Sequence, residues 1–202
     1  MKTYYYMGKL LLETQVSVDG FMADANGGTG WMVWSWGPEW GWDKALQAYH
    51  TRLHESLGGI LISSQMAREG FIAHWRSAAS DPRDARNTFA RLIDEAPKYI
   101  CSTTLAPGEA IPGGRENTKI LGGDLGRAIG ELKASIGGDL IVYGGSTLVS
   151  SVISLDLVDE YHLIVNPVAL AEGLPVFKSP RQLNLVRSTS FGSGIVVNQY
   201  RK

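Results

Sequence analysis

The sequence predicts one α/β domain of three layers, in which helices cover both faces of a mostly parallel central sheet. Short apolar runs of strand length alternate with amphipathic segments of helix length from residue 9 to residue 153, as in a doubly wound sheet. The tail differs, because strand-like segments at 182–190 and 195–201 flank a Gly-containing loop and predict an antiparallel hairpin. No linker-like segment interrupts the 202 residues, so residues 1–202 are expected to form a single domain.

Composition and charge exclude several classes of partner. The net charge of −1 provides no electrostatic basis for binding nucleic acid or an anionic membrane. No apolar run approaches the length that spans a bilayer, and residues 1–6 lack the apolar core of a signal peptide. The single cysteine, Cys101, has no partner for an internal disulfide, which indicates a reducing compartment. We therefore expect a cytoplasmic protein that acts on a small molecule.

The first strand is expected over residues 9–18, where Leu10-Leu11-Leu12 is followed by increasingly polar residues. Asp19-Gly20 then ends the strand in a turn. In open α/β sheets ligands gather at the carboxyl ends of the strands, so Asp19 and Gly20 are expected to face a site. Asp19 can also be a turn-forming residue without a catalytic role, and this alternative stays open.

A tryptophan-rich loop follows over residues 25–42 and contains five of the six tryptophans of the chain. The spacing of these residues fits neither helix nor strand, and Gly37-Pro38 interrupts any regular element. Because indoles stack well on flat aromatic ligands, the loop is interpreted as a lid over such a ligand. Two alternatives are a loop that packs on itself and an oligomer interface. The expected substrate contacts are Trp31, Trp34, Trp36 and Trp40.

A helix is expected over residues 43–57, with Asp43 as its N-cap. His50 and His54 lie four residues apart on this helix, a spacing that can bind a metal. No third ligand is evident near them in the sequence, and pairs of surface histidines are far commoner than metal sites. We therefore expect no metal site.

Three further strands are expected at 59–62, 98–101 and 118–121, with helical segments within 67–79, 83–95 and 124–136. Each of these strands ends in small or hydroxyl-bearing residues. This repetition predicts a site along the edge of the sheet where parallel strands end. The residues concerned are Ser63, Ser64, Ser102, Thr103, Gly122 and Gly123.

The most informative stretch spans residues 139–149. A buried strand at 140–143 runs directly into Gly144-Gly145, and a helix follows from Ser146. The glycines allow a ligand to approach the backbone closely, and the first turn of the helix supplies unpaired N–H groups to a phosphate. Neither the dinucleotide fingerprint nor the P-loop is present. A tight turn without any ligand is the alternative.

Several segments together resemble one protein family, the dihydrofolate-reductase-like family that includes the C-terminal reductase domain of the riboflavin-biosynthesis protein RibD. The resemblance covers nearly the whole chain. It lies in Ser17-Val18-Asp19-Gly20-Phe21-Met22-Ala23, Pro97-Lys98-Tyr99-Ile100-Cys101-Ser102-Thr103-Thr104-Leu105, Ile141-Val142-Tyr143-Gly144-Gly145-Ser146-Thr147-Leu148-Val149, Leu157-Val158-Asp159-Glu160-Tyr161 and Gly173-Leu174-Pro175-Val176-Phe177.

The resemblance implies an NADPH-dependent reductase that is often a homodimer. It places the pyrophosphate over Gly144-Gly145, the 2′-phosphate at the strand ends, and the nicotinamide near the Asp19-Gly20 turn, beneath the tryptophan loop. The residues that it implies for cofactor binding are Gly20, Ser63, Ser64, Gln65, Ser102, Thr103, Gly122, Tyr143, Gly144, Gly145, Ser146, Thr147 and Leu148.

The chain departs from the family pattern at its phosphate-binding cations. The family's G-R-x-T-Y-E stretch is Ser63-Ser64-Gln65-Met66-Ala67-Arg68-Glu69 here, and the arginine of its S-R-T-L motif is Thr103. A charge-assisted contact to phosphate contributes roughly 1.5–3 kcal/mol. Unless Arg68 reaches back, these losses favour NADH, a different cofactor or none. Glu13 replaces the lysine of riboflavin-pathway members, so a role in riboflavin biosynthesis is not expected.

Two hypotheses on function follow. The first is a reductase that uses NADPH or NADH to transfer hydride to a C=N, C=O or C=C bond of a small aromatic or polycyclic substrate, with Asp19 or Glu13 orienting the substrate or relaying a proton. The second is a repurposed fold, either a cofactor-free enzyme of secondary metabolism or a small-molecule-binding protein that uses the tryptophan loop. A structural homodimer with the tryptophans at its interface is a third, weaker alternative.

Overall fold

The computed structural model describes residues 7–106 and 108–202. Residues 1–6, on which the signal-peptide expectation rests, lie outside this part. The strands are β1 (Leu10–Val16), β2 (Phe21–Ala23), β3 (Leu57–Ser63), β4 (Lys98–Cys101), β5 (Thr118–Leu121), β6 (Asp139–Gly144), β7 (Glu160–Val165), β8 (Leu174–Pro175), β9 (Asn184–Ser190) and β10 (Val196–Arg201). The helices are α1 (Lys44–His54), α2 (Ser64–Arg68), α3 (Phe71–Ser80), α4 (Asn87–Glu95), α5 (Leu125–Ser135) and α6 (Ser146–Ser154).

The central sheet has the strand order β5-β4-β3-β6-β1-β7-β10-β9. The strands from β5 to β7 are parallel, whereas β10 runs antiparallel to both of its neighbours. β1 lies between β6 and β7, so that Leu11 pairs with Ile141 and Glu13 pairs with His162. The predicted mostly parallel sheet with a C-terminal hairpin is therefore confirmed.

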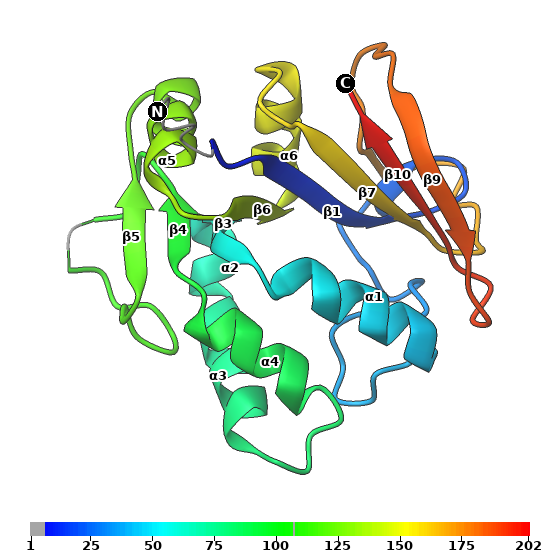
Figure 1. The fold of residues 1–202 in the computed structure, drawn as a ribbon, viewed down its shortest axis with the longest axis horizontal. Coiled ribbons are helices and arrows are strands. Elements are labelled where there is room, and N and C mark those ends of the chain that lie inside the picture. Colours follow the sequence, from blue (N-terminus) through cyan, green and yellow to red (C-terminus); the bar gives the residue numbers. More distant parts are fainter. Residues whose placement is uncertain (1–6, 107) are drawn as a thin grey trace, which may run out of the picture.

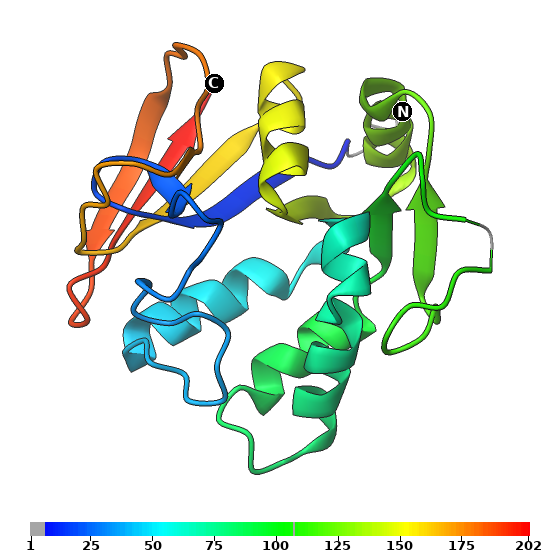
Figure 2. The ribbon, with the colours of Figure 1, turned by 180° about the vertical axis from the view of Figure 1, so that it is seen from behind.

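Helices cover both faces of this sheet (Figure 1). α5 and α6 lie on one side, and α1 to α4 lie on the other, together with the tryptophan-rich loop (Figure 2). The alternation of β1 explains this arrangement, because Leu10 and Leu12 pack into the core beneath α6 while Leu11 packs into the core that contains Trp34 and Leu46. The polar residue Glu13 shares the face of Leu11 on β1.

Two local details differ from the sequence expectation. The helix expected within residues 67–79 is two helices, α2 and α3, because Gly70 adopts a φ of +97° that other residues rarely take. A small second sheet, β2 paired with β8, escaped prediction because each strand is only two or three residues long. It joins the turn after β1 to the segment after β7.

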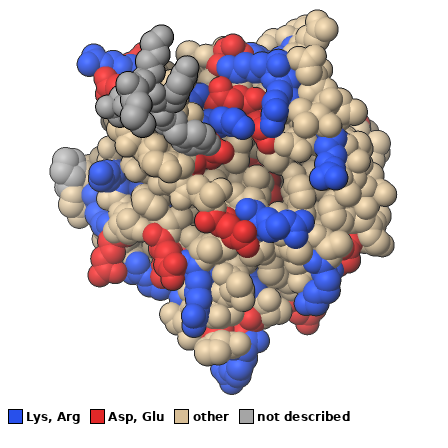
Figure 3. Space-filling model, in the orientation of Figure 1, with Lys and Arg blue, Asp and Glu red and all other residues tan. Residues whose placement is uncertain are grey.

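The surface shows no strong charge asymmetry on the face in Figure 3, where lysines and arginines are interspersed with aspartates and glutamates. Within the residues that the structure describes, no helix is both long and apolar enough to cross a membrane. At the sheet edge, β9 leaves the apolar side chains of Leu185 and Val186 exposed. The homodimer that the family resemblance implies stays a prediction.

Candidate functional site

Two cavities open where the parallel strands β1, β3, β4 and β6 end. The first has a volume of about 530 Å³ and lies beneath the tryptophan-rich loop. The second has a volume of about 390 Å³ and extends toward β4 and α5. Ser63, Gln65, Gly145 and Ser146 line both cavities. We call these four shared residues the seam.

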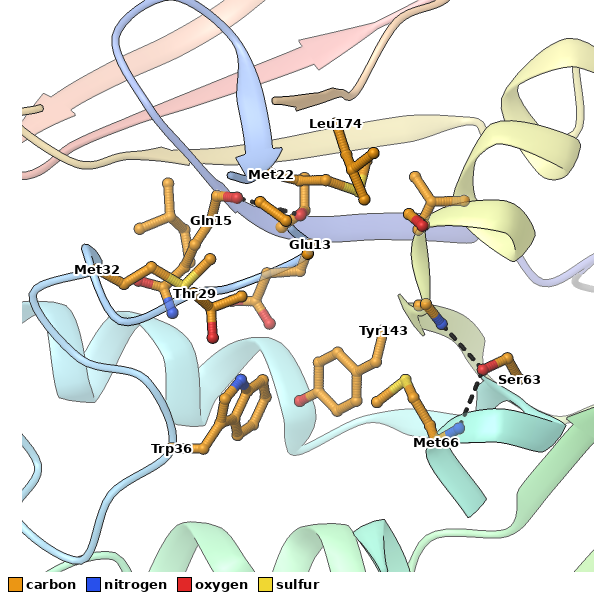
Figure 4. Close-up of a pocket in the computed structure, with 18 of the residues that line it drawn as sticks. Glu13, Gln15, Met22, Thr29, Met32, Trp36, Ser63, Met66, Tyr143 and Leu174 are labelled. Carbon is orange, nitrogen blue, oxygen red and sulfur yellow. Dashed lines mark hydrogen bonds between the residues drawn. The ribbon is translucent and has the colours of Figure 1, made fainter. Parts of the chain in front are cut away.

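The seam is built around the Gly144-Gly145 turn, whose peptide bond is cis. Gly144 has a φ of +123°, which side-chain-bearing residues rarely adopt. The backbone N–H of Gly145 donates to Ser63 Oγ at 3.1 Å, and Ser63 Oγ also accepts from Met66 N at 3.2 Å (Figure 4). A Cβ on Gly145 would meet only Ser63 Oγ, at 3.9 Å, so it would project into the space that the two cavities share.

The first turn of α6 adjoins the seam. Its N-cap is Gly145, which has no side chain, and no side-chain hydrogen bond caps this helix. The N–H groups of the first turn and the positive end of the helix dipole therefore remain available to an anion. Thr147 and Leu148 line the second cavity, and Ser146 lines both. This is the arrangement that the sequence suggested for a phosphate.

Small hydroxyl side chains dominate the second cavity. Ser64, Ser102, Thr103 and Thr104 all line it, and Cys101 lies beside them. The Ser102 hydroxyl accepts from Thr104 N at 3.1 Å and from Leu105 N at 2.9 Å, and so holds the turn after β4. Burial raises the pKa of the Cys101 thiol to about 12, so the thiol is neutral at physiological pH.

No lysine or arginine is among the described residues that line either cavity. Arg68, the nearest candidate in the sequence, lies on α2 but pairs with Glu109, with Nε 2.6 Å from Oε1. Its guanidinium also makes a second bond to the other oxygen of Glu109 at 3.3 Å. Arg68 therefore does not replace the missing phosphate-binding cations in this arrangement.

The first cavity has aromatic and thioether walls. Trp34, Trp36 and Trp42 line it together with Met22, Met32 and Met66. The indoles also pack on one another, since the Trp34 ring centroid lies 5.4 Å from that of Trp36 and 4.8 Å from that of Trp42. The loop thus packs its own small core and at the same time presents indoles to the cavity.

The tryptophans do not all share this role. Trp31 donates its indole N–H to Gly28 O at 3.1 Å, and Trp40 packs against Phe89 with centroids 5.5 Å apart. Neither lines a cavity, whereas Trp42, which the sequence did not single out as a substrate contact, lines the first. The positions of the tryptophans along an irregular loop do not indicate which of them line the cavity and which pack elsewhere.

Glu13, His50 and Tyr143 form the polar floor of the first cavity, and His54 lies against Tyr143 and Glu13 without lining it. His50 Nδ1 lies 2.6 Å from Glu13 Oε1, and the Tyr143 hydroxyl is hydrogen-bonded to His54 Nε2. Glu13, Trp36 and Tyr143 turn toward the same space in Figure 4. The floor and His54 therefore bring an acid, two imidazoles and a phenol from β1, α1 and β6 to one place.

The burial of this group perturbs its ionisation. Burial and then the neighbouring His50 lower the pKa of His54 to about 3, so this ring is neutral at physiological pH. Burial alone would raise the pKa of Glu13, but the interactions with His50, and more weakly with His54 and His162, together outweigh this effect and lower the pKa. Burial, followed by the charge of Glu13, raises the pKa of Tyr143 well above its usual value.

The structure corrects the interpretation of the two histidines. They were expected to be surface residues, but His50 and His54 are 2% and 3% exposed. A third potential ligand, Glu13, lies against them, although 37 residues separate Glu13 from His50 in the sequence. The period-two alternation of β1 could have indicated this, because it places Glu13 on the same face as Leu11, against which α1 packs.

Three other expected site residues lie elsewhere. The Asp19 carboxylate accepts from Ser17 Oγ at 2.5 Å and from the backbone of Leu170 and Ala171, which favours the turn-forming alternative. Asp19 and its neighbour Gly20 line neither cavity. Gly122 also lies outside the lining, while the adjacent Gly123 lines the second cavity.

The sequence matches the family of RibD C-terminal domains over residues 8–197. The chain belongs to this family. Its RibD C-terminal domain has the dihydrofolate-reductase-like fold, as the resemblance implied, and the family is one of NADPH-dependent reductases. The family assignment rests on the whole chain rather than on the seam alone.

Individual proteins resemble this chain over nearly its whole length. The chain is 28% identical over 193 residues to the uncharacterized protein YyaP of Bacillus subtilis (strain 168), across 93% of this chain and 92% of YyaP. A putative riboflavin biosynthesis protein from Shewanella sp. PV-4 matches in structure with a TM-score of 0.66 and 21% identity, over 96% of this chain and 98% of that one. Dihydrofolate reductase from Enterococcus faecalis, complexed with NADP(H), matches with a TM-score of 0.55 and 11% identity, over 98% of both chains. At these identities the two structures show the fold alone.

Proposed function

We propose that the protein is a nicotinamide-dependent reductase that transfers hydride to a C=N, C=O or C=C bond of a small aromatic or polycyclic substrate. The observation that carries this proposal is the seam, where two cavities of unlike chemistry meet at the uncapped start of α6. A dinucleotide has the matching shape, since its charged pyrophosphate lies between two larger groups. Its pyrophosphate would lie at the first turn of α6, with one nucleoside in each cavity.

The residues present fit this cofactor. The open space beside Gly145 admits a ligand against the backbone, and the hydroxyls of Ser64, Ser102 and Thr103 can bind a ribose or an adenine edge. Ser63 uses its oxygen as a double acceptor, which leaves its own O–H free to donate to the cofactor. A reduced nicotinamide supplies the hydride when it is bound.

The first cavity would hold the substrate. Trp36 and Trp34 offer indole surfaces for a flat ring, and the methionine side chains can adapt to its outline. A flat ring stacked on these walls would displace water from the reacting bond, while Glu13 and Tyr143 present polar groups from the floor. Asp19 is not needed in this arrangement, because its carboxylate holds the turn after β1.

The same lining supports NADH as the preferred form of the cofactor. A 2′-phosphate in the second cavity would find hydroxyls but no lysine or arginine among the described lining residues. Arg68 would have to break its ion pair with Glu109 to contact the 2′-phosphate. Losing one charge-assisted contact costs roughly 1.5–3 kcal/mol, or about one to two orders of magnitude in affinity.

Titration with NADH and NADPH tests the proposal. Tryptophan emission reports on the first cavity, because three indoles line it, and calorimetry gives an independent binding isotherm. Saturable binding of NADH, with weaker binding of NADPH, is the expected result. A folded sample that binds neither nucleotide would contradict the proposal.

A second candidate function is a repurposed fold that binds or converts a small molecule without a nicotinamide. The missing cations favour it, because the second cavity then needs no ligand. The open seam argues against it, since a plain turn would not need space for a ligand beside Gly145. In this case neither nucleotide would bind, while flat aromatic compounds would still quench the emission of Trp36.

A further inference from the structure

A compact group of possible metal ligands lies at the floor of the first cavity. Glu13 lies on β1, and His50 and His54 lie on consecutive turns of α1. One ligand atom from each of the three residues lies within 4.8 Å of the other two. All three side chains are almost completely buried, so they are not a solvated cluster of surface charges.

One oxygen of this group lacks a partner. Glu13 Oε1 accepts from His50, but Glu13 Oε2 is buried and has no hydrogen-bond partner among the residues that the structure describes. His54 Nε2 lies 3.6 Å from this oxygen, which is beyond hydrogen-bond distance. A buried carboxylate oxygen without a partner is costly, so an additional group between Glu13 and His54 would stabilise the site.

The backbone orients His54 as a ligand. His54 Nδ1 lies 2.6 Å from the carbonyl oxygen of His50, and a carbonyl can only accept, so Nδ1 carries the proton. The lone pair of Nε2 therefore faces Glu13 and accepts a hydrogen bond from the Tyr143 hydroxyl, which a metal ion would displace from this nitrogen. Histidines that bind metals commonly donate their other ring N–H to a carbonyl or carboxylate in this way.

We propose that Glu13, His50 and His54 bind one divalent transition-metal ion, with Zn²⁺ as the best match to two imidazoles and one carboxylate. Ligands at about 2.0–2.1 Å from a tetrahedral ion lie roughly 3.4 Å apart. The 3.6 Å between Glu13 Oε2 and His54 Nε2 is close to this spacing. His50 Nδ1 and Glu13 Oε1 are 2.6 Å apart, so they would have to separate to about the same spacing for the ion to replace the proton between them.

The ion would be accessible from the first cavity and could act on a ligand bound there. Glu13, His50 and Tyr143 line the first cavity, so the fourth coordination position would be reached from the space that holds a ligand. An ion there can polarise a carbonyl or imine, as a Lewis acid does. Two neutral imidazoles and one carboxylate would leave a divalent ion with a net positive charge, which would attract an anionic or polarisable oxygen of a ligand to the fourth position.

Metal analysis of the full chain, without an affinity tag, tests the site directly. The protein is stripped with chelator, incubated with Zn²⁺, dialysed and analysed for bound metal. The same sample with Co²⁺ gives a visible absorption that reports tetrahedral coordination. We expect one ion per chain and the visible band. A folded protein that retains no metal would overturn the proposal and leave a buried hydrogen-bonded group in its place.

Variants separate this site from adventitious binding. Glu13→Gln keeps the size of the side chain and removes its charge, and His54→Ala removes one ligand, so each should weaken Zn²⁺ binding by at least the roughly 10- to 100-fold that loss of an outer-shell partner costs. His74→Ala is the matched control, because His74 does not belong to the group of possible metal ligands and is hydrogen-bonded to Arg86. If His54→Ala does not fold, the comparison of Glu13→Gln with wild type still tests the site. Equal binding by wild type and Glu13→Gln would overturn the assignment.

The metal test is independent of the proposed reductase activity. It needs neither nicotinamide nor substrate, so failure to bind metal would leave the two-cavity account of cofactor binding intact. Conversely, a protein that binds Zn²⁺ but neither nucleotide would support the metal site and contradict the reductase proposal.

Discussion

The two cavities share a seam but differ in almost every other property. The first has indole and thioether walls and a floor of buried ionisable groups, whereas the second has small hydroxyls and a neutral thiol. The backbone at the seam suits any dinucleotide, because N–H groups and a helix dipole bind phosphate without regard to what is attached to it. The side chains of the two cavities would therefore decide which substrate and which form of the cofactor are accepted.

The largest effect is expected where the cavities meet. Gly145→Val would put a branched side chain into the shared space and weaken binding of both nucleotides by at least about 100-fold, or roughly 2.7 kcal/mol. Binding is measured by calorimetry, and circular dichroism checks the fold. Gly130→Val is the matched control, because a Cβ at Gly130 meets no atom within 4 Å. Unchanged binding by Gly145→Val would contradict the role of the seam.

A cation added to the second cavity should change cofactor preference without affecting the first. Thr103→Arg is expected to tighten NADPH binding by roughly 10- to 100-fold and to leave NADH nearly unchanged, since the new guanidinium can pair with the 2′-phosphate. Thr189→Arg, on the edge strand β9, controls for the added charge. Equal gains for the two nucleotides, or none, would show that the 2′-position does not lie near Thr103.

Loss of an indole should affect only ligands of the first cavity. Trp36→Ala is expected to weaken binding of a flat probe such as 2-naphthol by about 10-fold, because an aromatic pair contributes roughly 0.5–1.5 kcal/mol beyond its buried area. Trp31→Ala is the control, since Trp31 does not line either cavity. If both variants lose the same affinity, the loop acts as one packed unit and not through Trp36.

The smallest effect concerns the thiol of the second cavity. With its pKa raised to about 12 by burial, Cys101 is mostly protonated below that pH, and we expect slow alkylation by iodoacetamide at pH 8. Bound NADH should slow the reaction further, by a few-fold. Cys101 is the sole cysteine, so total thiol loss measures it directly. Alkylation that saturating NADH does not slow would argue against an adenosine group in this cavity.

The sequence predicted most of the fold and only part of the site. Alternation of apolar strands with amphipathic helices is a local pattern, and it placed β4 and the final hairpin within two residues. The Gly144-Gly145 turn was also visible, because strand, glycines and helix start are contiguous. Gly70, which divides α2 from α3, was not recognised, since a single glycine inside a helical pattern has several meanings.

The parts that escaped prediction depend on contacts between distant segments. Glu13 meets His50 only because α1 packs across β1, and Arg68 is unavailable only because it pairs with Glu109, 41 residues away. The division of the tryptophans into wall and core likewise follows from how the loop packs on His50, Trp75 and Phe89. Spacing along the chain indicates only the face of β1 on which Glu13 lies, and it contains none of the other contacts.

A structure of the protein determined with NADH bound tests the central claim most directly. The account predicts the pyrophosphate at the first turn of α6 beside Gly145, the adenosine among the hydroxyls of the second cavity, and the nicotinamide in the first cavity facing Trp36. Nucleotide bound away from the seam, or contained wholly in one cavity, would contradict it.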